Sequence, residues 1–241
     1  DAELEHLAVT PSDRHGTLRD AIRSYLTEQQ LPAPRSAAIG IANPVTGDQV
    51  SMTNHDWSFS ISELQAALGL DRLLVLNDFA VLALALPKRR AEDLRQTGGG
   101  TAGQNAPLAV IGAGTGLGMA GLLPAAAGRF IAVAGEGGHG TLAAADEFED
   151  RIVARLRNRF GHASAERALS GPGLENLHEA CAALAGEPAS LLAAPEITRR
   201  ALAGEDALCQ RAVELFFSFL GTEGGNLALT LGARGGVYIS G

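Results

Sequence analysis

The alternation of apolar and polar residues predicts helices and strands in turn along the first third of the chain. Apolar residues recur at helical spacing over 17–29, and a run of small and β-branched residues at 36–42 is typical of a buried strand. Residues 73–76 form another apolar strand pattern. Residues 79–86 predict a short helix that ends at Pro87.

Weaker patterns add three elements to this region. Residues 6–10 predict a short strand, and 49–52 predict a return strand after the turn at 43–47. Ser60 is a suitable N-cap for a helix over 61–68, because Glu63 occupies the capping-box position.

The rest of the chain opens with a polar, glycine-rich stretch at 97–105. Strands and helices follow it, and the last long apolar helical region is interrupted by Gly224-Gly225. The expected strands are 108–111, 119–123, 130–133 and 237–240, and the expected helical regions are 146–160 and 206–231. Strands alternating with helices twice over favour two α/β lobes, which we place at residues 1–88 and 89–241, with a hinge near 87–105.

Composition narrows the class of protein. Hydrophobic residues make up 46% of the 241 residues, enough for a sizeable core, and the net charge of −8 argues against a nucleic-acid surface. Cys181 and Cys209 are the 2 cysteines and lack metal-type spacing, which argues against a disulfide scaffold or a cysteine-based zinc site and fits a reducing cytosol. No apolar run approaches the ~18 residues of a membrane-spanning helix.

An Asn-Asp pair, Asn77-Asp78, interrupts the apolar run at 72–87. A carboxylate beside a core is costly unless something pairs with it. One interpretation is structural, because Asp is a good N-cap for a helix beginning at Phe79. The other is functional, and the residues alone leave that role open.

The glycines of 112–118 follow a predicted strand, and Thr115 between Gly114 and Gly116 adds a hydroxyl donor. Their backbone N–H groups could cradle a phosphate, yet a glycine-rich hairpin is an equally good interpretation. A G-x-G-x-x-G match starts at Gly116, but a strand rather than a helix follows it, so we regard it as chance. A Walker loop is excluded because Lys88 is the only lysine.

Glu136-Gly-Gly-His139 places a carboxylate and an imidazole around a tight turn. Such a turn could bind a metal, although no third ligand lies nearby at a recognisable spacing. It could bind a polyol, since carboxylates accept hydrogen bonds from hydroxyls and His can donate to them. It could also be purely structural. Glu166 would contribute only if it folded back onto the same site, and is otherwise a surface residue.

Several ordered blocks together resemble the bacterial glucokinases of the actin-like sugar-kinase superfamily. The likeness covers nearly the whole chain, and the combination of blocks is far more specific than any single one. The blocks are residues 52–57, 77–79, 112–118, 135–139, 162–167, 170–173, 225–229 and 235–239.

The resemblance implies an α/β, two-lobed actin-like (ribonuclease H-like) fold with glucose bound between the lobes. It implies an ATP-dependent kinase that makes glucose 6-phosphate at the entry to glycolysis, with Asp78 as the base for the 6-hydroxyl. Glucose-binding roles fall on Asn77, Glu136, His139 and Glu166. The turn Gly114-Thr115-Gly116 corresponds to the second phosphate loop, and no residue is expected to be a metal ligand.

The same resemblance implies ATP as the phosphate donor, Mg²⁺ carried with ATP, and a cytoplasmic homodimer that binds neither nucleic acid nor a membrane. The family's first phosphate loop and the segments beyond Gly241 are absent, so we expect both ends of a longer protein to be missing. Two alternatives stay open: a non-catalytic sugar-sensing domain of a regulator, and a kinase for another hexose.

Overall fold

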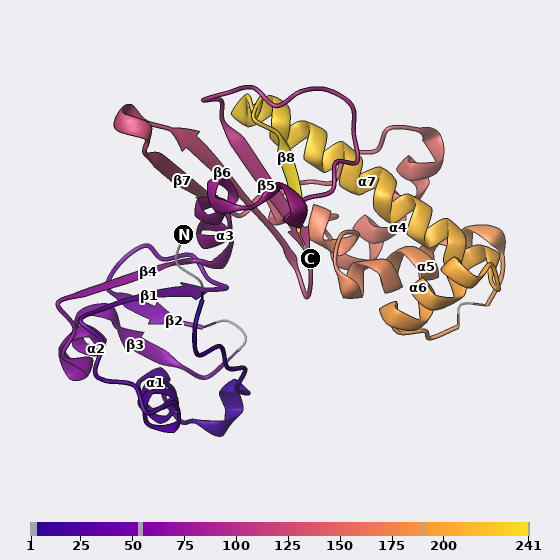
Figure 1. Cartoon of the computed structure of the whole chain (residues 1–241). Helices are drawn as coiled ribbons and strands as arrows, with labels where there is room; N and C mark the ends of the chain where they lie inside the picture. Colours follow the sequence, from indigo (N-terminus) through magenta and orange to yellow (C-terminus); the bar gives the residue numbers. More distant parts are fainter. Residues whose placement is uncertain (1–3, 53–54, 189, 241) are drawn as a thin grey trace. The chain divides into compact units, whose positions relative to one another are not determined.

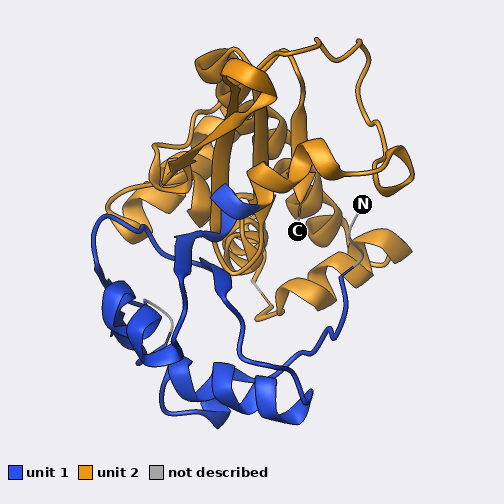
Figure 2. Ribbon diagram, turned by 60° about the vertical axis from the view of Figure 1, so that its left-hand side comes forward, with its two compact units in different colours: residues 1–81 blue, residues 82–241 orange. Residues whose placement is uncertain are grey.

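The computed structural model describes residues 4–52, 55–188 and 190–240. The chain divides into two compact units, one up to Val81 and one from Leu82 onwards (Figure 2). This division falls within a helix, since α3 spans Asp78–Ala85. Among the described residues, no helix is both long and apolar enough to cross a membrane.

The N-terminal unit contains two small sheets (Figure 1). β1 (Ser36–Ile41) pairs in parallel with β4 (Arg72–Asn77), and β2 (Gln49–Ser51) pairs antiparallel with β3 (Ser58–Ser60). Two helices accompany them, α1 (Leu18–Glu28) and α2 (Ile61–Leu68). A small core of Ile41, Val50 and Val75 joins the two sheets. The register sets Ile41 opposite Asn77, so the carboxyl ends of β1 and β4 lie side by side.

The C-terminal unit contains a four-stranded sheet in the order β7-β6-β5-β8. β5 pairs antiparallel with β6 and parallel with β8, and β6 pairs antiparallel with β7. The strands are β5 (Leu108–Ala113), β6 (Leu117–Pro124), β7 (Phe130–Gly135) and β8 (Val237–Ser240). The helices are α4 (Glu147–Phe160), α5 (Gly171–Ala185), α6 (Ala194–Ala203) and α7 (Ala207–Leu231).

Short 3₁₀ turns link these elements. They are η1 (Ser12–Arg14), η2 (Leu86–Lys88), η3 (Ala91–Asp93), η4 (Ala126–Gly128), η5 (Gly137–His139) and η6 (Ala165–Arg167).

The long helix α7 organises the core of the C-terminal unit (Figure 1). It packs against α5 and α6 and against strands β5 and β8. Its residues Phe219 and Cys209 are fully buried, as are Leu177 of α5 and Ile197 of α6. Aliphatic side chains dominate this core.

Most of the predicted elements are confirmed; the exceptions are two wrong predictions and three elements that were not predicted, namely β3 and the helices α5 and α6. The strand predicted at 6–10 is wrong: this stretch is irregular and exposed, His6 has a φ of 53°, and its carbonyl accepts a hydrogen bond from the Tyr25 hydroxyl. Gly224-Gly225 does not interrupt the helix, because packing of α7 outweighs the cost of roughly 1 kcal/mol per glycine. The strand β3 was not predicted, since its three residues are too short to show a period.

Side-chain caps begin most of the helices. Thr17, Ser60, Asp146 and Ser170 each accept a hydrogen bond from the backbone N–H three residues ahead, and Asp206 caps α7 in a similar way. The cap predicted at Ser60 is therefore confirmed.

Glu149 is a buried carboxylate that joins α4 to α7. Its side chain is 3% exposed; Oε2 accepts from the Ala145 N–H at 2.7 Å and Oε1 from the Ser218 hydroxyl at 2.6 Å. Because both oxygens are paired, the carboxylate is tolerated beside the apolar core.

We expect Glu149→Ala to lower the free energy of unfolding by about 2 kcal/mol, because it removes two hydrogen bonds to a charged group. Glu149→Gln should be intermediate, since its amide can accept from Ala145 and donate to Ser218. The matched control is Glu147→Ala, at the exposed start of α4, which should cost less than about 1 kcal/mol. Urea denaturation followed by circular dichroism measures all three, and equal midpoints for Glu149→Ala and Glu147→Ala would contradict the assignment.

Candidate active site

Asn77 and Asp78 lie where β4 ends and α3 begins, and both are half-buried. The Asn77 Oδ1 accepts from the N–H groups of Phe79 and Ala80, at 3.0 and 3.2 Å. Asn77 therefore provides the helix cap that the sequence analysis considered for Asp78. Asp78 itself is the first residue of α3.

The Asp78 carboxylate is held through one of its two oxygens. Its Oδ1 accepts from the Phe79 N–H at 2.9 Å and from the Asn77 side-chain amide at 3.1 Å. Neither of these two hydrogen bonds involves Oδ2. The carboxylate also lies at the positive end of the α3 dipole, which stabilises its negative charge.

The glycines of 112–118 form a β-hairpin. Gly112 and Gly118 pair across β5 and β6, and the Gly114 N–H donates to the Gly116 carbonyl at 2.8 Å. Gly114 and Thr115 are exposed at the tip of this turn. The geometry is that of a glycine-rich hairpin between strands, with its tip open to a ligand.

Glu166 lies on η6 and contacts this hairpin. Its Oε2 accepts from the Leu117 N–H at 3.0 Å. A Cβ added at Gly116 would lie 2.4 Å from the same Oε2, so only glycine allows the carboxylate to approach the turn this closely. The Glu166 side chain therefore contacts the hairpin.

Glu136 and His139 flank the turn η5, which packs against β6 and η6. The His139 Nε2 lies 3.9 Å from the Glu136 Oε2, and the side chains are 67% and 54% exposed. A Cβ at Gly138 would lie 2.2 Å from the Leu117 carbonyl oxygen, so this glycine lets the turn rest on β6. Both polar groups are left free to contact a ligand.

Backbone hydrogen bonds join these segments around Glu166. The Ala165 N–H donates to the Gly140 carbonyl at 2.9 Å, and the Gly171 N–H donates to the Gly114 carbonyl at 2.8 Å. The Ser170 hydroxyl donates to the Glu166 carbonyl at 2.8 Å and caps α5. The C-terminal unit thus gathers Glu166, the turn of Glu136 and His139, and the hairpin tip.

The remaining predicted site residues belong to the other unit. Asn77 and Asp78 lie in the N-terminal unit, as does the block at 52–57, of which Thr53 and Asn54 fall outside the described residues. The assignments of these site residues rest on the contacts that the residues make within their own unit.

Glu223 of α7 is a polar group that the sequence analysis missed. Its Oε1 is buried without a hydrogen-bond partner among the described residues. Burial raises the pKa of the Glu223 carboxyl, and a hydrogen bond from Ala143 lowers it by less. Carboxyl groups with a raised pKa are frequent at functional sites. The sequence could have indicated Glu223 by its position, because it is a carboxylate within a mostly apolar helical region.

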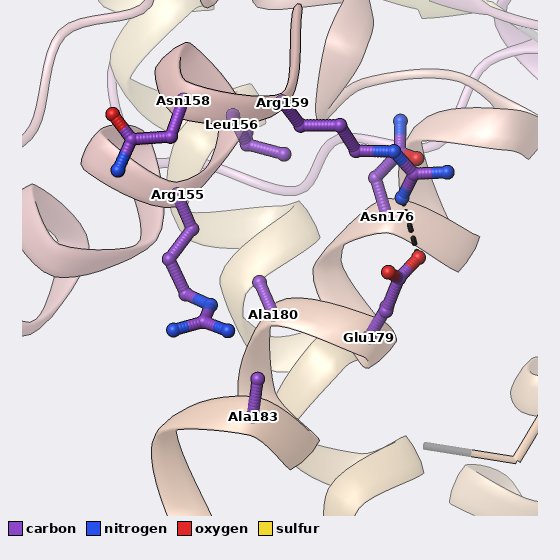
Figure 3. Close-up of a pocket in the computed structure, with 8 residues that line it drawn as sticks. All are labelled: Arg155, Leu156, Asn158, Arg159, Asn176, Glu179, Ala180 and Ala183. Carbon is purple, nitrogen blue, oxygen red and sulfur yellow. Dashed lines mark hydrogen bonds and ion pairs between the residues drawn. The ribbon is translucent and has the colours of Figure 1, made fainter.

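A pocket of about 520 Å³ lies between α4 and α5, apart from the predicted residues (Figure 3). Arg159 spans its rim and pairs with Glu179. The Asn176 amide donates to the Arg167 carbonyl at 2.9 Å. Its lining contains none of the residues assigned to glucose or ATP.

Comparison with known proteins gives one consistent family. The family model described as Glucokinase matches residues 1–241. The chain is 54% identical over 230 residues to a glucokinase of Aromatoleum aromaticum, covering 95% of this chain and 69% of that protein. It is 52% identical over 238 residues to a glucokinase of Chromobacterium violaceum, covering 99% of this chain and 68% of the relative.

Comparison with solved structures agrees with the match to the glucokinase family. A glucokinase from an Antarctic psychrotroph aligns with a TM-score of 0.85 and 37% identity, covering 95% of this chain and 71% of that one. A hexokinase of the ROK family from Thermus thermophilus, at 19% identity and a TM-score of 0.60 over 93% of this chain and 67% of that one, shares the fold alone. The predicted α/β sugar-kinase fold is confirmed, and the chain belongs to the glucokinase family.

Proposed function

We propose that this protein transfers the γ-phosphoryl group of ATP to the 6-hydroxyl of glucose, giving glucose 6-phosphate and ADP. Family membership supports the reaction. The observation that carries the site assignment is the Glu166 carboxylate, fixed by the Leu117 N–H beside the hairpin tip and next to the turn of Glu136 and His139. Carboxylates and an imidazole around one turn suit a ring of sugar hydroxyls.

The chemical step requires a base for the attacking oxygen. As the bond from O6 to the γ-phosphorus forms and the bond to the bridging oxygen of ADP breaks, the O6 proton passes to the Asp78 carboxylate. Oδ2 suits this role, because Oδ1 is already occupied by Phe79 and Asn77. Asn77 thereby positions the base, and its own Oδ1 is committed to capping α3.

The hairpin tip supplies the phosphate contacts in this proposal. The exposed Thr115 hydroxyl stabilises charge on the transferring phosphoryl group. Mg²⁺ enters with ATP as part of the substrate. The cytoplasmic location and the homodimer follow from the family resemblance alone.

A sugar-sensing domain without catalysis is the second candidate. It would need the hydroxyl-binding residues but neither Asp78 nor the hairpin. Glucose-dependent release of ADP from the purified full-length protein separates the two functions. Parallel assays with fructose and mannose define the hexose.

Asp78→Asn should retain glucose binding while kcat falls by at least ~100-fold, because an amide cannot accept the O6 proton. The variant keeps an oxygen for the Phe79 N–H, so the start of α3 should persist. Asp71→Asn is the matched control: it removes an exposed carboxylate of the same unit, paired with Arg35 at 2.7 Å, and should leave kcat unchanged. Steady-state kinetics measures both, and an unchanged kcat for Asp78→Asn would refute the assignment of the base.

Glu136→Gln and His139→Ala should each weaken glucose binding much more than ATP binding, since both side chains are exposed on the turn and are assigned to sugar hydroxyls. Isothermal titration with each ligand separately gives the comparison, and Glu147→Gln is the exposed control in the same unit. Equal losses for glucose and ATP would mean that the turn has a structural role only.

Gly116→Ala should weaken glucose binding, because the new methyl group would displace the Glu166 carboxylate from the Leu117 N–H. Gly114→Ala is the matched control two residues away, where an added Cβ meets nothing within 4 Å. Glucose titrations without ATP compare the variants. If both substitutions weaken binding alike, the contact between Glu166 and the turn does not determine glucose affinity.

A further inference from the structure

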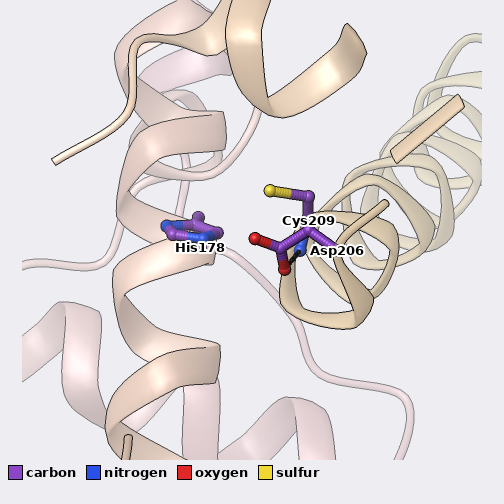
Figure 4. A group of neighbouring side chains, drawn as sticks. All are labelled: His178, Asp206 and Cys209. Atoms are coloured by element: carbon purple, nitrogen blue, oxygen red, sulfur yellow. Dashed lines mark hydrogen bonds between the residues drawn. The ribbon is translucent and has the colours of Figure 1, made fainter. Parts of the chain in front are cut away.

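A separate polar cluster lies where the start of α7 meets α5. His178, Asp206 and Cys209 each offer a ligand atom there, and these atoms all lie within 4.8 Å of one another (Figure 4). The cluster has no part in the proposed phosphoryl transfer. Its three side chains are of the types that bind transition metals.

His178 lies in the middle of α5 and is only 3% exposed. Figure 4 shows its ring facing Asp206 and Cys209. Within the described residues the ring makes no hydrogen bond, and it interacts electrostatically with the Asp206 carboxylate. A metal ion could accept the lone pair of one ring nitrogen, since imidazole is the commonest metal ligand in proteins.

Asp206 holds its carboxylate in place by capping α7. Its Oδ1 accepts from the N–H groups of Leu208 and Cys209 at 2.9 and 3.1 Å. Neither of these backbone hydrogen bonds involves Oδ2, which lies 4.0 Å from the Arg200 Nη1. The half-exposed side of Asp206 also leaves room for a water molecule.

Cys209 presents its thiol from the first turn of α7 and is completely buried. Cysteine binds metal ions as the thiolate, so binding of an ion would release the thiol proton to solvent.

We propose that His178, Asp206 and Cys209 bind a divalent transition-metal ion, of which Zn²⁺ is the best match. Nitrogen, oxygen and sulfur together suit Zn²⁺, whereas Mg²⁺ and Ca²⁺ prefer oxygen alone. Three protein ligands and a water complete a tetrahedron. Bonds of about 2.0–2.3 Å require the ligand atoms to move somewhat closer together than they are here.

The Arg200 guanidinium lies near the cluster, and the Glu196 carboxylate balances its charge. The Arg200 Nη1 is 4.0 Å from the Asp206 Oδ2, but the same guanidinium binds Glu196 at 2.6 Å. The pair of Arg200 and Glu196 therefore adds little net repulsion toward a metal ion. The ion would bridge α5 and α7, whose packing forms much of the core of the C-terminal unit.

The sequence alone predicts no metal ligands, because neither Cys181 nor Cys209 has a metal-type spacing. The cluster escapes that criterion because its residues come from two helices and meet only in the folded chain. The competing interpretation is that His178 and Asp206 attract each other electrostatically and bind no ion.

The test is metal binding by the full chain after treatment with a chelator. Zn²⁺ is titrated in competition with a chromophoric chelator, and Co²⁺ is used as a probe of sulfur ligation. We expect one ion per chain and, with Co²⁺, the near-ultraviolet absorption of a cobalt–thiolate bond. Zn²⁺ should also raise the melting temperature of the chain, because it binds the folded form.

Three conservative variants should each weaken Zn²⁺ binding by more than the ~10–100-fold that loss of an outer-shell partner costs. These are His178→Gln, Asp206→Asn and Cys209→Ser. Asn is also a good N-cap, so Asp206→Asn should keep α7 intact. Circular dichroism without metal checks the fold of each variant.

Cys181→Ser is the matched control, because Cys181 is a buried cysteine of the same core and lies on α5. It should retain full binding, the cobalt–thiolate absorption and the rise in melting temperature. Absence of binding by the parent chain would overturn the proposal, as would binding that survives Cys209→Ser. Loss of binding in His139→Ala would place the ion at the exposed turn instead, and this result would also overturn the proposal.

Discussion

A carboxylate held close to the apolar interior is costly unless hydrogen-bond donors pair with it, and much of the structure depends on how this constraint is met. Backbone N–H groups supply most of the donors: Phe79 for Asp78, Leu117 for Glu166, Ala145 for Glu149 and Cys209 for Asp206. An unpaired buried charge would cost several kcal/mol, comparable with the whole stability of a domain. Helix starts and strand ends have unpaired N–H groups to offer, so these carboxylates lie there.

The same constraint shapes the proposed active site. A carboxylate with one oxygen bound to the backbone is fixed in orientation and still has an oxygen for a substrate. Asp78 and Glu166 both have this arrangement, at the start of α3 and beside the β5–β6 hairpin. Fixed orientation matters for phosphoryl transfer, where catalysis consists largely of positioning and electrostatic stabilisation. Glu223 shows the opposite arrangement, with a buried oxygen that lacks a partner among the described residues.

Local patterns predicted the elements well where the segment with periodic apolar residues was long. The apolar spacing of 17–29 and 146–160 corresponds to α1 and α4, and the Ser60 cap lies where the capping-box pattern placed it. Prediction failed where tertiary packing overrode local preference. The glycine pair in α7 should break a helix, yet the contacts of that helix with two strands and two helices maintain it. The strand pattern at 6–10 has suitable residues but no described partner strand.

The sequence by itself determined the family and most of the elements, and it proposed the residues of the candidate site, because motifs and periodicities are local and survive in the unfolded chain. Only the tertiary structure decided which of these residues meet. The Glu166 carboxylate reaches Leu117 through packing of η6 on the hairpin, and His178 approaches Cys209 through packing of α5 on α7. It also gave the cap of α3 to Asn77 and left an oxygen of Asp78 free for chemistry. Such contacts join residues far apart in the chain, and they depend on shape and burial, which exist only once the core has formed.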